Sequence, residues 1–246
     1  MEPVTAHTKA LLVTGTIVPN SIYVEHRDAL ARRNEYYQAL KFYAGHAGQY
    51  KIFFLENSEY DIFADKEFAE LLKNKNIGLF KFPKSSAFSL GKGYQEFEML
   101  DHAIAKLAGG FDTFIKITGR YKILNLGKFL PLNCKGILAD NHKKQGVTQT
   151  NFFMVNGAFY QENIAGLYQQ ADDSKGDFIE KVVYRKLFSD PQLKGLIKLL
   201  PCNPAIKGIS GSYGGELRRN KLKLFVRNAE RKFLKLAGIN RFFIEY

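Results

Sequence analysis

The chain has 246 residues and a formal net charge of +12, because 36 lysines and arginines outnumber 24 aspartates and glutamates. This length is enough for one large α/β domain or two small ones. No stretch approaches the roughly 20 consecutive apolar residues of a membrane-spanning helix, and the N-terminus lacks the pattern of a signal peptide. Cys134 and Cys202 stand far apart without metal-ligand spacing, so we expect a reduced, cytoplasmic protein.

The sequence lacks the motifs that identify several enzyme classes. It contains no GxSxG motif and no histidine pair with metal-ligand spacing, which argues against a serine hydrolase of that type and a zinc enzyme. The excess positive charge instead indicates a negatively charged partner, which leaves nucleic acid, an anionic membrane surface and a phosphorylated substrate open.

The first half of the chain alternates between predicted strands and predicted helices. In chain order these are a strand at 10–17, a helix at 25–43, a strand at 50–55, a helix at 66–73, a strand at 77–82, a helix from 91 to about 107 and a strand at 111–118. Apolar, β-branched and aromatic residues crowd the strands, and Gly45 and Pro83 end two of the elements. Such alternation favours a mainly parallel sheet with helices on its faces.

The helix expected at 25–43 mixes apolar and charged residues. We expect Leu30, Tyr37, Leu40 and Phe42 among its buried positions, and Arg27, Arg32, Arg33 and Lys41 are its charged ones. This pattern predicts an amphipathic helix that covers one face of the sheet.

Polar residues follow the predicted strands at the edge where open α/β sheets place their ligands. The candidate residues for binding a ligand at this edge are Thr14, Gly15, Thr16, Glu56, Asn57, Lys92, Gly93, Lys116, Thr118, Gly119 and Arg120. Lys92 and Gly93 open a helix, whose free N–H groups and dipole favour an anion. Lysine and arginine side chains suit a diphosphate. Ordinary turn chemistry and a plain helix start explain the same residues without a ligand.

The second half of the chain contains shorter elements. We expect helices at 126–132, 163–168 and 178–188, a strand at 149–155, a short apolar piece at 137–139 and a last strand or loop at 205–211. Three acids here are candidates for a general base. Asp177 is typical of a helix N-cap, Asp140 ends the apolar piece, and Glu180 lies in the first turn of a helix, where it also suits the dipole. We choose Glu180 as the base, with Asp140 second.

A long basic helix is predicted at 217–236. Nine of the lysines and arginines fall between Arg218 and Arg241. Opposite the charged face, an apolar stripe consists of Leu222, Phe225, Val226, Ala229, Phe233 and Leu236. This combination predicts an anchor on an anionic membrane surface; a helix packed on the domain with a solvated basic face is the alternative. We therefore divide the chain into a domain at 1–211 and a basic segment at 212–246.

Five stretches carry a family resemblance, namely LLVTGTIVPN, RRNEYYQAL, KIFFLENSEYD, GKGYQEFEML and FIKITGRYKILNL. They resemble bacterial glycosyltransferases of lipopolysaccharide and capsule clusters, which are single-domain and GT-A-like. The resemblance implies a Rossmann-type α/β domain that moves a sugar from a nucleotide-activated donor to a lipid-linked or glycan acceptor. A lipid-linked acceptor, together with the basic segment at 212–246, predicts a peripheral location at the inner face of the cytoplasmic membrane, and we expect no nucleic-acid partner.

One departure from this family concerns the metal. GT-A enzymes usually carry an Asp-x-Asp where this chain has Thr118-Gly119-Arg120. Lys116, Arg120 and Lys92 could neutralise the leaving group without a metal ion. We therefore name no metal ligand and no cofactor, and leave the dependence on a divalent metal open.

A basic nucleic-acid-binding protein without catalytic activity is the alternative function. The charge and the stacking surface of 13 tyrosines and 21 phenylalanines support it. The sequence contains no signature of a recognition module, however, and most of these aromatic residues lie in apolar runs that resemble a protein core.

Overall fold

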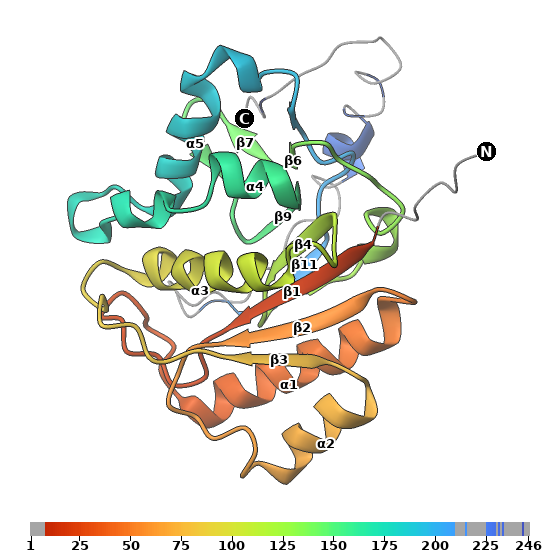
Figure 1. Ribbon diagram of the computed structural model, residues 1–246, viewed down its shortest axis with the longest axis vertical. Helices are drawn as coiled ribbons and strands as arrows, with labels where there is room; N and C mark the ends of the chain where they lie inside the picture. Colours follow the sequence, from red (N-terminus) through yellow and green to blue (C-terminus); the bar gives the residue numbers. More distant parts are fainter. Residues whose placement is uncertain are drawn as a thin grey trace.

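A computed structural model describes residues 8–209, 215, 225–229, 231, 233 and 243 (Figure 1). Its centre is a seven-stranded sheet. Along the sheet the strands are β10 (Ile197–Lys198), β6 (Ile137–Leu138), β9 (Phe152–Asn156), β4 (Thr113–Thr118), β1 (Lys9–Gly15), β2 (Lys51–Glu56) and β3 (Gly78–Lys81). β4, β1, β2 and β3 are parallel, and β9 runs antiparallel to its neighbours β4 and β6. The mainly parallel α/β sheet predicted from the alternation is confirmed.

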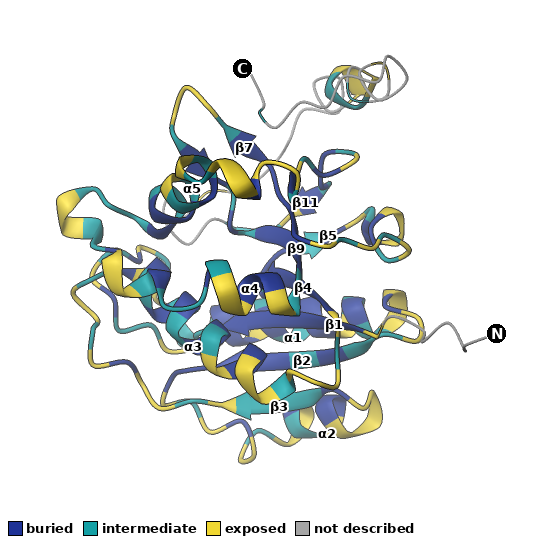
Figure 2. Cartoon of the chain, turned by 45° about the horizontal axis from the view of Figure 1, so that its top comes forward, coloured by how far each residue is buried: buried dark blue, intermediate teal, exposed yellow. Residues whose placement is uncertain are grey.

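Helices cover both faces of the sheet, as Figure 1 shows. α1 (Ala29–His46) and α2 (Lys66–Asn74) pack on one face, and α3 (Lys92–Leu107), α4 (Gly157–Asn163) and α5 (Ile179–Ser189) pack on the other. Alternate residues of β1 serve the two layers, because side chains of a strand point to opposite faces. Leu11 and Val13 join the core under α1 and α2, whereas Ala10 and Leu12 join the core under α3. β1, β4 and β9 are accordingly buried along almost their whole length (Figure 2).

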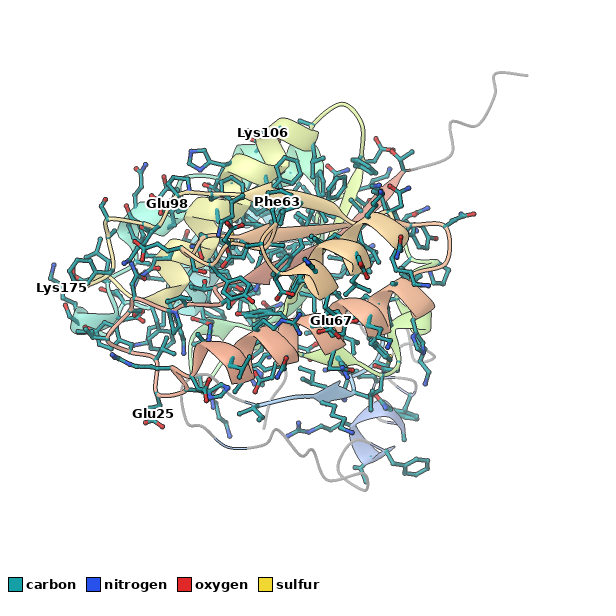
Figure 3. All side chains as sticks on the ribbon, turned by 90° about the horizontal axis from the view of Figure 1, so that it is seen from below. Glu25, Phe63, Glu67, Glu98, Lys106 and Lys175 are labelled. Atoms are coloured by element: carbon teal, nitrogen blue, oxygen red, sulfur yellow. The ribbon has the colours of Figure 1, made fainter. Side chains whose placement is uncertain are left out.

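The burial of α1 differs from the expectation. Leu30 is 69% exposed, whereas Arg32 and Arg33 are buried. Arg33 pairs with Asp65 through its Nε at 2.6 Å and with Glu67 on α2, labelled in Figure 3, through its Nη1 at 2.9 Å. A buried guanidinium is tolerated where its N–H groups are satisfied. Two arginines that the sequence analysis named as charged positions are therefore buried, and Leu30, expected among the buried residues, is exposed.

The second half departs further from the expected elements. The predicted helix at 126–132 is a three-residue 3₁₀ turn, η1 (Leu126–Lys128). The helix expected at 163–168 is instead α4 followed by η2 (Leu167–Gln170). Side-chain capping explains the earlier start, since the Asn156 carbonyl oxygen accepts a hydrogen bond from the Phe159 amide at 3.1 Å. The predicted strand at 149–155 is present as β9 and begins three residues later.

The remaining elements are short. They are the hairpin of β7 (Asn141–His142) and β8 (Val147–Thr148), the pair β5 (Lys122–Ile123) and β11 (Ile206–Lys207), and the 3₁₀ turns η3 (Asp173–Lys175) and η4 (Pro191–Leu193). β11 confirms a strand within 205–211. The β7–β8 hairpin contacts α5.

Most of the predicted basic helix at 217–236 lies outside the described residues. The described residues 225–229, 231 and 233 are helical. Arg231 binds the Leu200 carbonyl at 2.7 Å and faces Asp140 at 3.1 Å. Phe225 is 71% exposed and Phe233 is 68% exposed. The described part of this segment therefore contacts the domain through the polar residues Asn228 and Arg231 and leaves aromatic residues of the expected stripe exposed.

No helix in the described part of the chain is both long and apolar enough to span a bilayer.

Candidate active site

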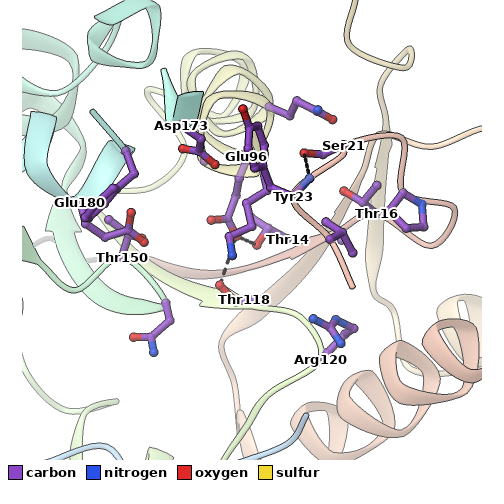
Figure 4. Close-up of a pocket in the computed structure, with 18 of the residues that line it drawn as sticks. Thr14, Thr16, Ser21, Tyr23, Glu96, Thr118, Arg120, Thr150, Asp173 and Glu180 are labelled. Carbon is purple, nitrogen blue, oxygen red and sulfur yellow. Dashed lines mark hydrogen bonds between the residues drawn. The ribbon is translucent and has the colours of Figure 1, made fainter. Parts of the chain in front are cut away.

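A pocket of about 810 Å³ lies where the carboxyl ends of β1 and β4 meet the start of α3 (Figure 4). The loop after β1, the segment 145–151, η3 and the start of α5 complete its wall. Parallel neighbouring strands bring their ends to one edge, which is why segments far apart in the sequence converge here.

Eight of the sequence-predicted site residues line this pocket, namely Thr14, Gly15, Thr16, Lys92, Gly93, Thr118, Arg120 and Glu180. Five do not line it, namely Glu56, Asn57, Lys116, Gly119 and Asp140. In Figure 4, Glu180 and Asp173 lie on one side, Arg120 and Thr16 lie on the other, and Thr14, Glu96 and Thr118 lie between them. The pocket therefore has two ends of different chemistry.

The first end of the pocket is cationic. Arg32 and Arg120 both line it and are only 4% and 7% exposed. Arg120 pairs with Glu35 at 2.9 Å, while Arg32 donates to backbone carbonyls, among them that of His26 at 3.1 Å. Burial lowers the pKa of Arg32, and the nearby charge of Arg120 lowers that pKa further. In the described part of the chain, Glu35 is the carboxylate that faces both guanidinium groups, so this end favours an anion.

Arg32 is a site residue that the sequence reasoning missed. Its position in α1 is recognisable only once the loop after β1 folds back onto the helix, because the guanidinium binds carbonyls of that loop. Arg32 donates through Nε to the Thr16 carbonyl at 3.0 Å and to the Ile17 carbonyl at 3.2 Å. The arginine thus holds the loop that forms one wall of the pocket.

The second end of the pocket is acidic. Glu180 lies in the first turn of α5, and its Oε1 accepts a hydrogen bond from the Thr150 hydroxyl at 2.9 Å. Burial raises the pKa of the Glu180 carboxyl above its ordinary value. A carboxylate that lines a pocket and has a raised pKa is suited to accept a proton near neutral pH.

The anion site expected at the start of α3 already faces a carboxylate of the chain. Asp173 of η3 accepts a hydrogen bond from the backbone N–H of Lys92. A Cβ at Gly91 would lie 2.2 Å from the carboxyl carbon of Asp173, and Gly91 has a φ of +112°. The glycine therefore allows Asp173 to approach the helix N-terminus closely, which is the interaction that the helix dipole favours.

Glu96 of α3 is a second residue that the sequence reasoning missed. Its Oε1 accepts a hydrogen bond from the Thr14 hydroxyl at 2.5 Å and forms an ion pair with Lys116 at 2.7 Å. The sequence contains one indication that Glu96 belongs to the site, because Glu96 follows Lys92 and Gly93 by one helical turn and shares their face. Glu96 ties the ends of β1 and β4 to α3 at the middle of the pocket.

Three of the residues outside the pocket wall support the loops that form it. Glu56 is fully buried and accepts a hydrogen bond from the Ile17 amide at 3.1 Å. The side-chain amide oxygen of Asn57 accepts a hydrogen bond from the Thr16 hydroxyl at 2.6 Å. Gly119 donates to the Thr14 carbonyl at 2.8 Å, and a Cβ there would lie 2.4 Å from that oxygen. The geometry assigns them a supporting position behind the wall in place of direct contact with a ligand.

Asp140 lies away from the pocket wall. It is 5% exposed, and one of its carboxylate oxygens faces Arg231 at 3.1 Å. This ion pair occupies the carboxylate that the sequence offered as the second choice for the base. The placement favours Glu180 over Asp140 for that role.

The residues at the end of β4 do not fit a divalent metal ion. Thr118, Gly119 and Arg120 supply a hydroxyl, a glycine and a guanidinium, whereas Mg²⁺ and similar ions prefer carboxylate and carbonyl oxygens. Among the described residues, no group of three or more His, Cys, Asp or Glu side chains is arranged to hold a metal.

Neither protein-family models nor curated proteins match the sequence. Solved structures match its fold. The glycosyltransferase GlyE of Streptococcus pneumoniae TIGR4 superposes with a TM-score of 0.50 and 9% identity, over 79% of this chain and 46% of that chain. The bifunctional glycosyltransferase WbbM superposes with a TM-score of 0.50 and 12% identity, over 95% of this chain and 45% of that chain. Each match spans less than half of the larger structure. These likenesses establish a glycosyltransferase fold of the GT-A-like type.

Proposed function

We propose that the protein is a glycosyltransferase that moves a sugar from a nucleotide-activated donor to a glycan or lipid-linked acceptor. The observation that carries the proposal is the two-ended pocket at the carboxyl edge of β1 and β4. Its cationic end, with Arg32 and Arg120, suits the diphosphate of a donor. Its acidic end, with Glu180, suits an acceptor hydroxyl that must lose a proton. A role in bacterial surface-polysaccharide synthesis, which the sequence resemblance implies, belongs to the same proposal.

The reaction follows from this arrangement as a single displacement. The acceptor oxygen forms a bond to the anomeric carbon while its proton passes to the Glu180 carboxylate. The bond from the anomeric carbon to the donor diphosphate breaks, and its electron pair leaves with the diphosphate. Arg120 and Arg32 stabilise the negative charge that grows on the leaving group. Thr14, Gly15 and Thr16 are proposed to contact the nucleoside, because they line the pocket where β1 ends.

A nucleotide panel tests the proposal directly. Thermal stability of the full chain is measured with nucleosides, nucleoside diphosphates and nucleotide sugars, because a ligand that binds the folded state raises the melting temperature. We expect one base to stabilise most, and its diphosphate to stabilise more than its nucleoside. Transfer assays with the corresponding nucleotide sugars then identify the sugar. No response to any nucleotide or nucleotide sugar would contradict the proposal.

Metal independence is the first prediction from the site. Because the end of β4 offers a guanidinium where a metal would need carboxylates, we expect sugar transfer to continue after dialysis against EDTA. The transfer rate is measured before and after dialysis, and again after addition of Mg²⁺ or Mn²⁺. A rate that is lost in EDTA and restored by either ion would show that the reaction needs a metal.

We further propose that the protein works at the inner face of the cytoplasmic membrane. The exposed Phe225, Val226 and Phe233 support a membrane surface, since they would enter the lipid interface. Of the nine cations in residues 218–241, Arg231 pairs with Asp140, and the other eight would attract anionic headgroups, each contributing about 1 kcal/mol near the surface. This placement would bring the pocket to a lipid-linked acceptor.

Vesicle binding tests the membrane proposal. The double replacement F225S/F233S is expected to weaken binding to vesicles of phosphatidylserine and phosphatidylcholine by roughly 10-fold or more, because burying one Phe side chain contributes about 1.5–3 kcal/mol. F63S is the matched control, since Phe63 is 74% exposed on another part of the molecule (Figure 3). Equal binding by F225S/F233S and the unmodified chain would contradict the proposal. Tighter binding to RNA than to vesicles at matched salt would favour the nucleic-acid alternative.

A further inference from the structure

Lys116 is a fully buried lysine in the middle of the central sheet. Its strand partners are Leu12 on β1 and Phe153 on β9, and the lysine is 0% exposed. An ammonium group in such a place costs free energy unless each of its hydrogens finds an acceptor. A methionine of similar length would fill the same space without that cost.

The ammonium of Lys116 uses its three N–H groups within the protein. Its Nζ lies 2.7 Å from Glu96 Oε1, 2.9 Å from the Thr118 hydroxyl oxygen and 2.7 Å from the Thr150 carbonyl oxygen. A lysine has three donors and no more. The sequence-based assignment of Lys116 to a donor phosphate therefore needs a correction, because these contacts leave no N–H for a ligand.

Thr150 connects Lys116 to the candidate base. Its carbonyl accepts the hydrogen bond from Lys116, and its hydroxyl donates to Glu180 Oε1 at 2.9 Å. Both carboxylates of this region, Glu96 and Glu180, line the pocket, while Lys116 lies behind them. A chain of three hydrogen bonds and ion pairs thus runs from Glu96 through Lys116 and Thr150 to Glu180.

Charges from two elements act on Glu180. Burial raises the pKa of its carboxyl and Glu96 on α3 raises that pKa as well, whereas the hydrogen bond from Thr150 and the charge of Lys116 on β4 lower it. Lys92 and Asp173 face each other at the start of α3. Lys116 is therefore the cation that opposes protonation of Glu180 from behind the pocket wall.

We propose that Lys116 is a positioning residue, which acts through Thr150 and Glu96 to hold the Glu180 carboxylate in place and negatively charged. The inference rests on the function proposed above for Glu180. It explains why the sheet carries a lysine in place of an apolar residue. It also gives Glu96 a role. The Glu96 carboxylate forms the ion pair with the Lys116 ammonium, and this ion pair reduces the effect of the lysine's positive charge on Glu180.

Carbon-13 NMR of carboxyl-labelled glutamates in the full chain tests the proposal without any substrate. The E180Q variant identifies the Glu180 signal by its loss. We expect that signal to titrate about one pH unit higher in K116M and lower in E96Q, because the first change removes an opposite charge and the second removes a like charge. The double variant K116M/E96Q is expected to titrate between the two single variants. A Glu180 signal that titrates at the same pH in K116M, E96Q and the unmodified chain would overturn the proposal.

Thr150 offers a second variant that leaves the buried charge pair intact. T150V removes the hydroxyl that donates to the Glu180 carboxylate but keeps the carbonyl that receives Lys116, and T150S restores the hydroxyl. We expect the Glu180 signal to titrate higher in T150V and near its original pH in T150S. If K116M does not fold, T150V and T150S still test the proposal. A Glu180 signal that titrates at the same pH in T150V as in the unmodified chain would contradict the link through Thr150.

The same variants separate this inference from the proposed function. If the titration moves as expected but no nucleotide sugar is consumed, the coupling of Lys116 to Glu180 stands and the proposed function fails. If sugar transfer occurs but its rate falls at the same acidic pH in K116M, T150V and the unmodified chain, the proposed function stands and the inference fails.

Discussion

Replacement of Glu180 by glutamine is expected to lower the rate of sugar transfer by a factor of about 10²–10⁴, which is the usual contribution of a general base. Glutamine keeps the shape of the side chain and can still accept the hydrogen bond from Thr150, but it cannot take a proton from the acceptor. Donor affinity is expected to stay unchanged, because Glu180 lies at the acidic end of the pocket. The measurements are kcat from transfer assays and the Kd of the donor nucleotide.

Two asparagine variants accompany this experiment. D177N removes an exposed carboxylate near the same helix start, where Asp177 pairs with Arg185, and is the matched control. D140N tests the second candidate base. We expect both to retain transfer, since neither carboxylate lines the pocket. Full activity in E180Q with loss in D140N would move the role to Asp140, and full activity in both would refute the base assignment.

The pH dependence of the rate has a defined sign. The base acts in its deprotonated form, and burial raises the pKa of the Glu180 carboxyl above its ordinary value of 4.5. The rate is therefore expected to fall as the pH drops through the raised pKa, at a higher pH than for an ordinary glutamate. A rate that stays constant down to the range of an exposed carboxylate would contradict this expectation.

Replacement of Arg120 by alanine is expected to weaken binding of the donor diphosphate by a factor of 10 or more. A hydrogen bond to a charged group contributes about 1.5–3 kcal/mol, and 1.4 kcal/mol corresponds to about a factor of ten. The matching nucleoside, which lacks phosphates, is expected to bind the variant and the unmodified chain equally. Calorimetric titration with the nucleoside and with its diphosphate measures both affinities.

The comparison of the two ligands distinguishes a lost contact from a damaged pocket. If R120A loses affinity for the nucleoside as strongly as for the diphosphate, loss of the Arg120–Glu35 ion pair has disturbed the pocket, and the phosphate role is not supported. R120K keeps the positive charge but cannot form bidentate hydrogen bonds to the phosphates. We therefore expect it to lose less affinity for the diphosphate than R120A does. R185A removes an exposed arginine on α5 and is the control for a simple change in net charge.

The sheet could be predicted because the residue patterns that indicate its strands lie within short segments of the sequence. Residues of β1, β2 and β4 are apolar and β-branched or aromatic, and each strand ends at a polar or glycine residue that the sequence shows directly. The alternation with helices then implied parallel neighbours and one edge for their carboxyl ends. Thr14, Thr118 and Arg120 could be named from this argument alone, and the structure brings all three to one pocket.

The supporting residues could not be separated from the lining ones in the same way. Lys116 and Arg120 lie four residues apart and carry the same charge, yet one ammonium is enclosed behind the wall and the other side chain enters the pocket. The difference arises because Lys116 lies within β4 whereas Arg120 lies in the turn after it, and because Glu96, twenty residues earlier, meets Lys116. Such a pairing depends on how α3 packs across the sheet.

By itself the sequence determined five strands of the central sheet (β1, β2, β3, β4 and β9), the mainly parallel arrangement of the sheet and the polar edge where the pocket lies, since periodicity and strand-end chemistry are properties of short segments. Only the tertiary structure decided which charges meet. It buried Arg32 against the loop after β1, placed Asp173 at the start of α3 and paired Asp140 with Arg231. These contacts join residues distant in sequence, and their free energy depends on burial and on the exact partner, neither of which a local pattern encodes.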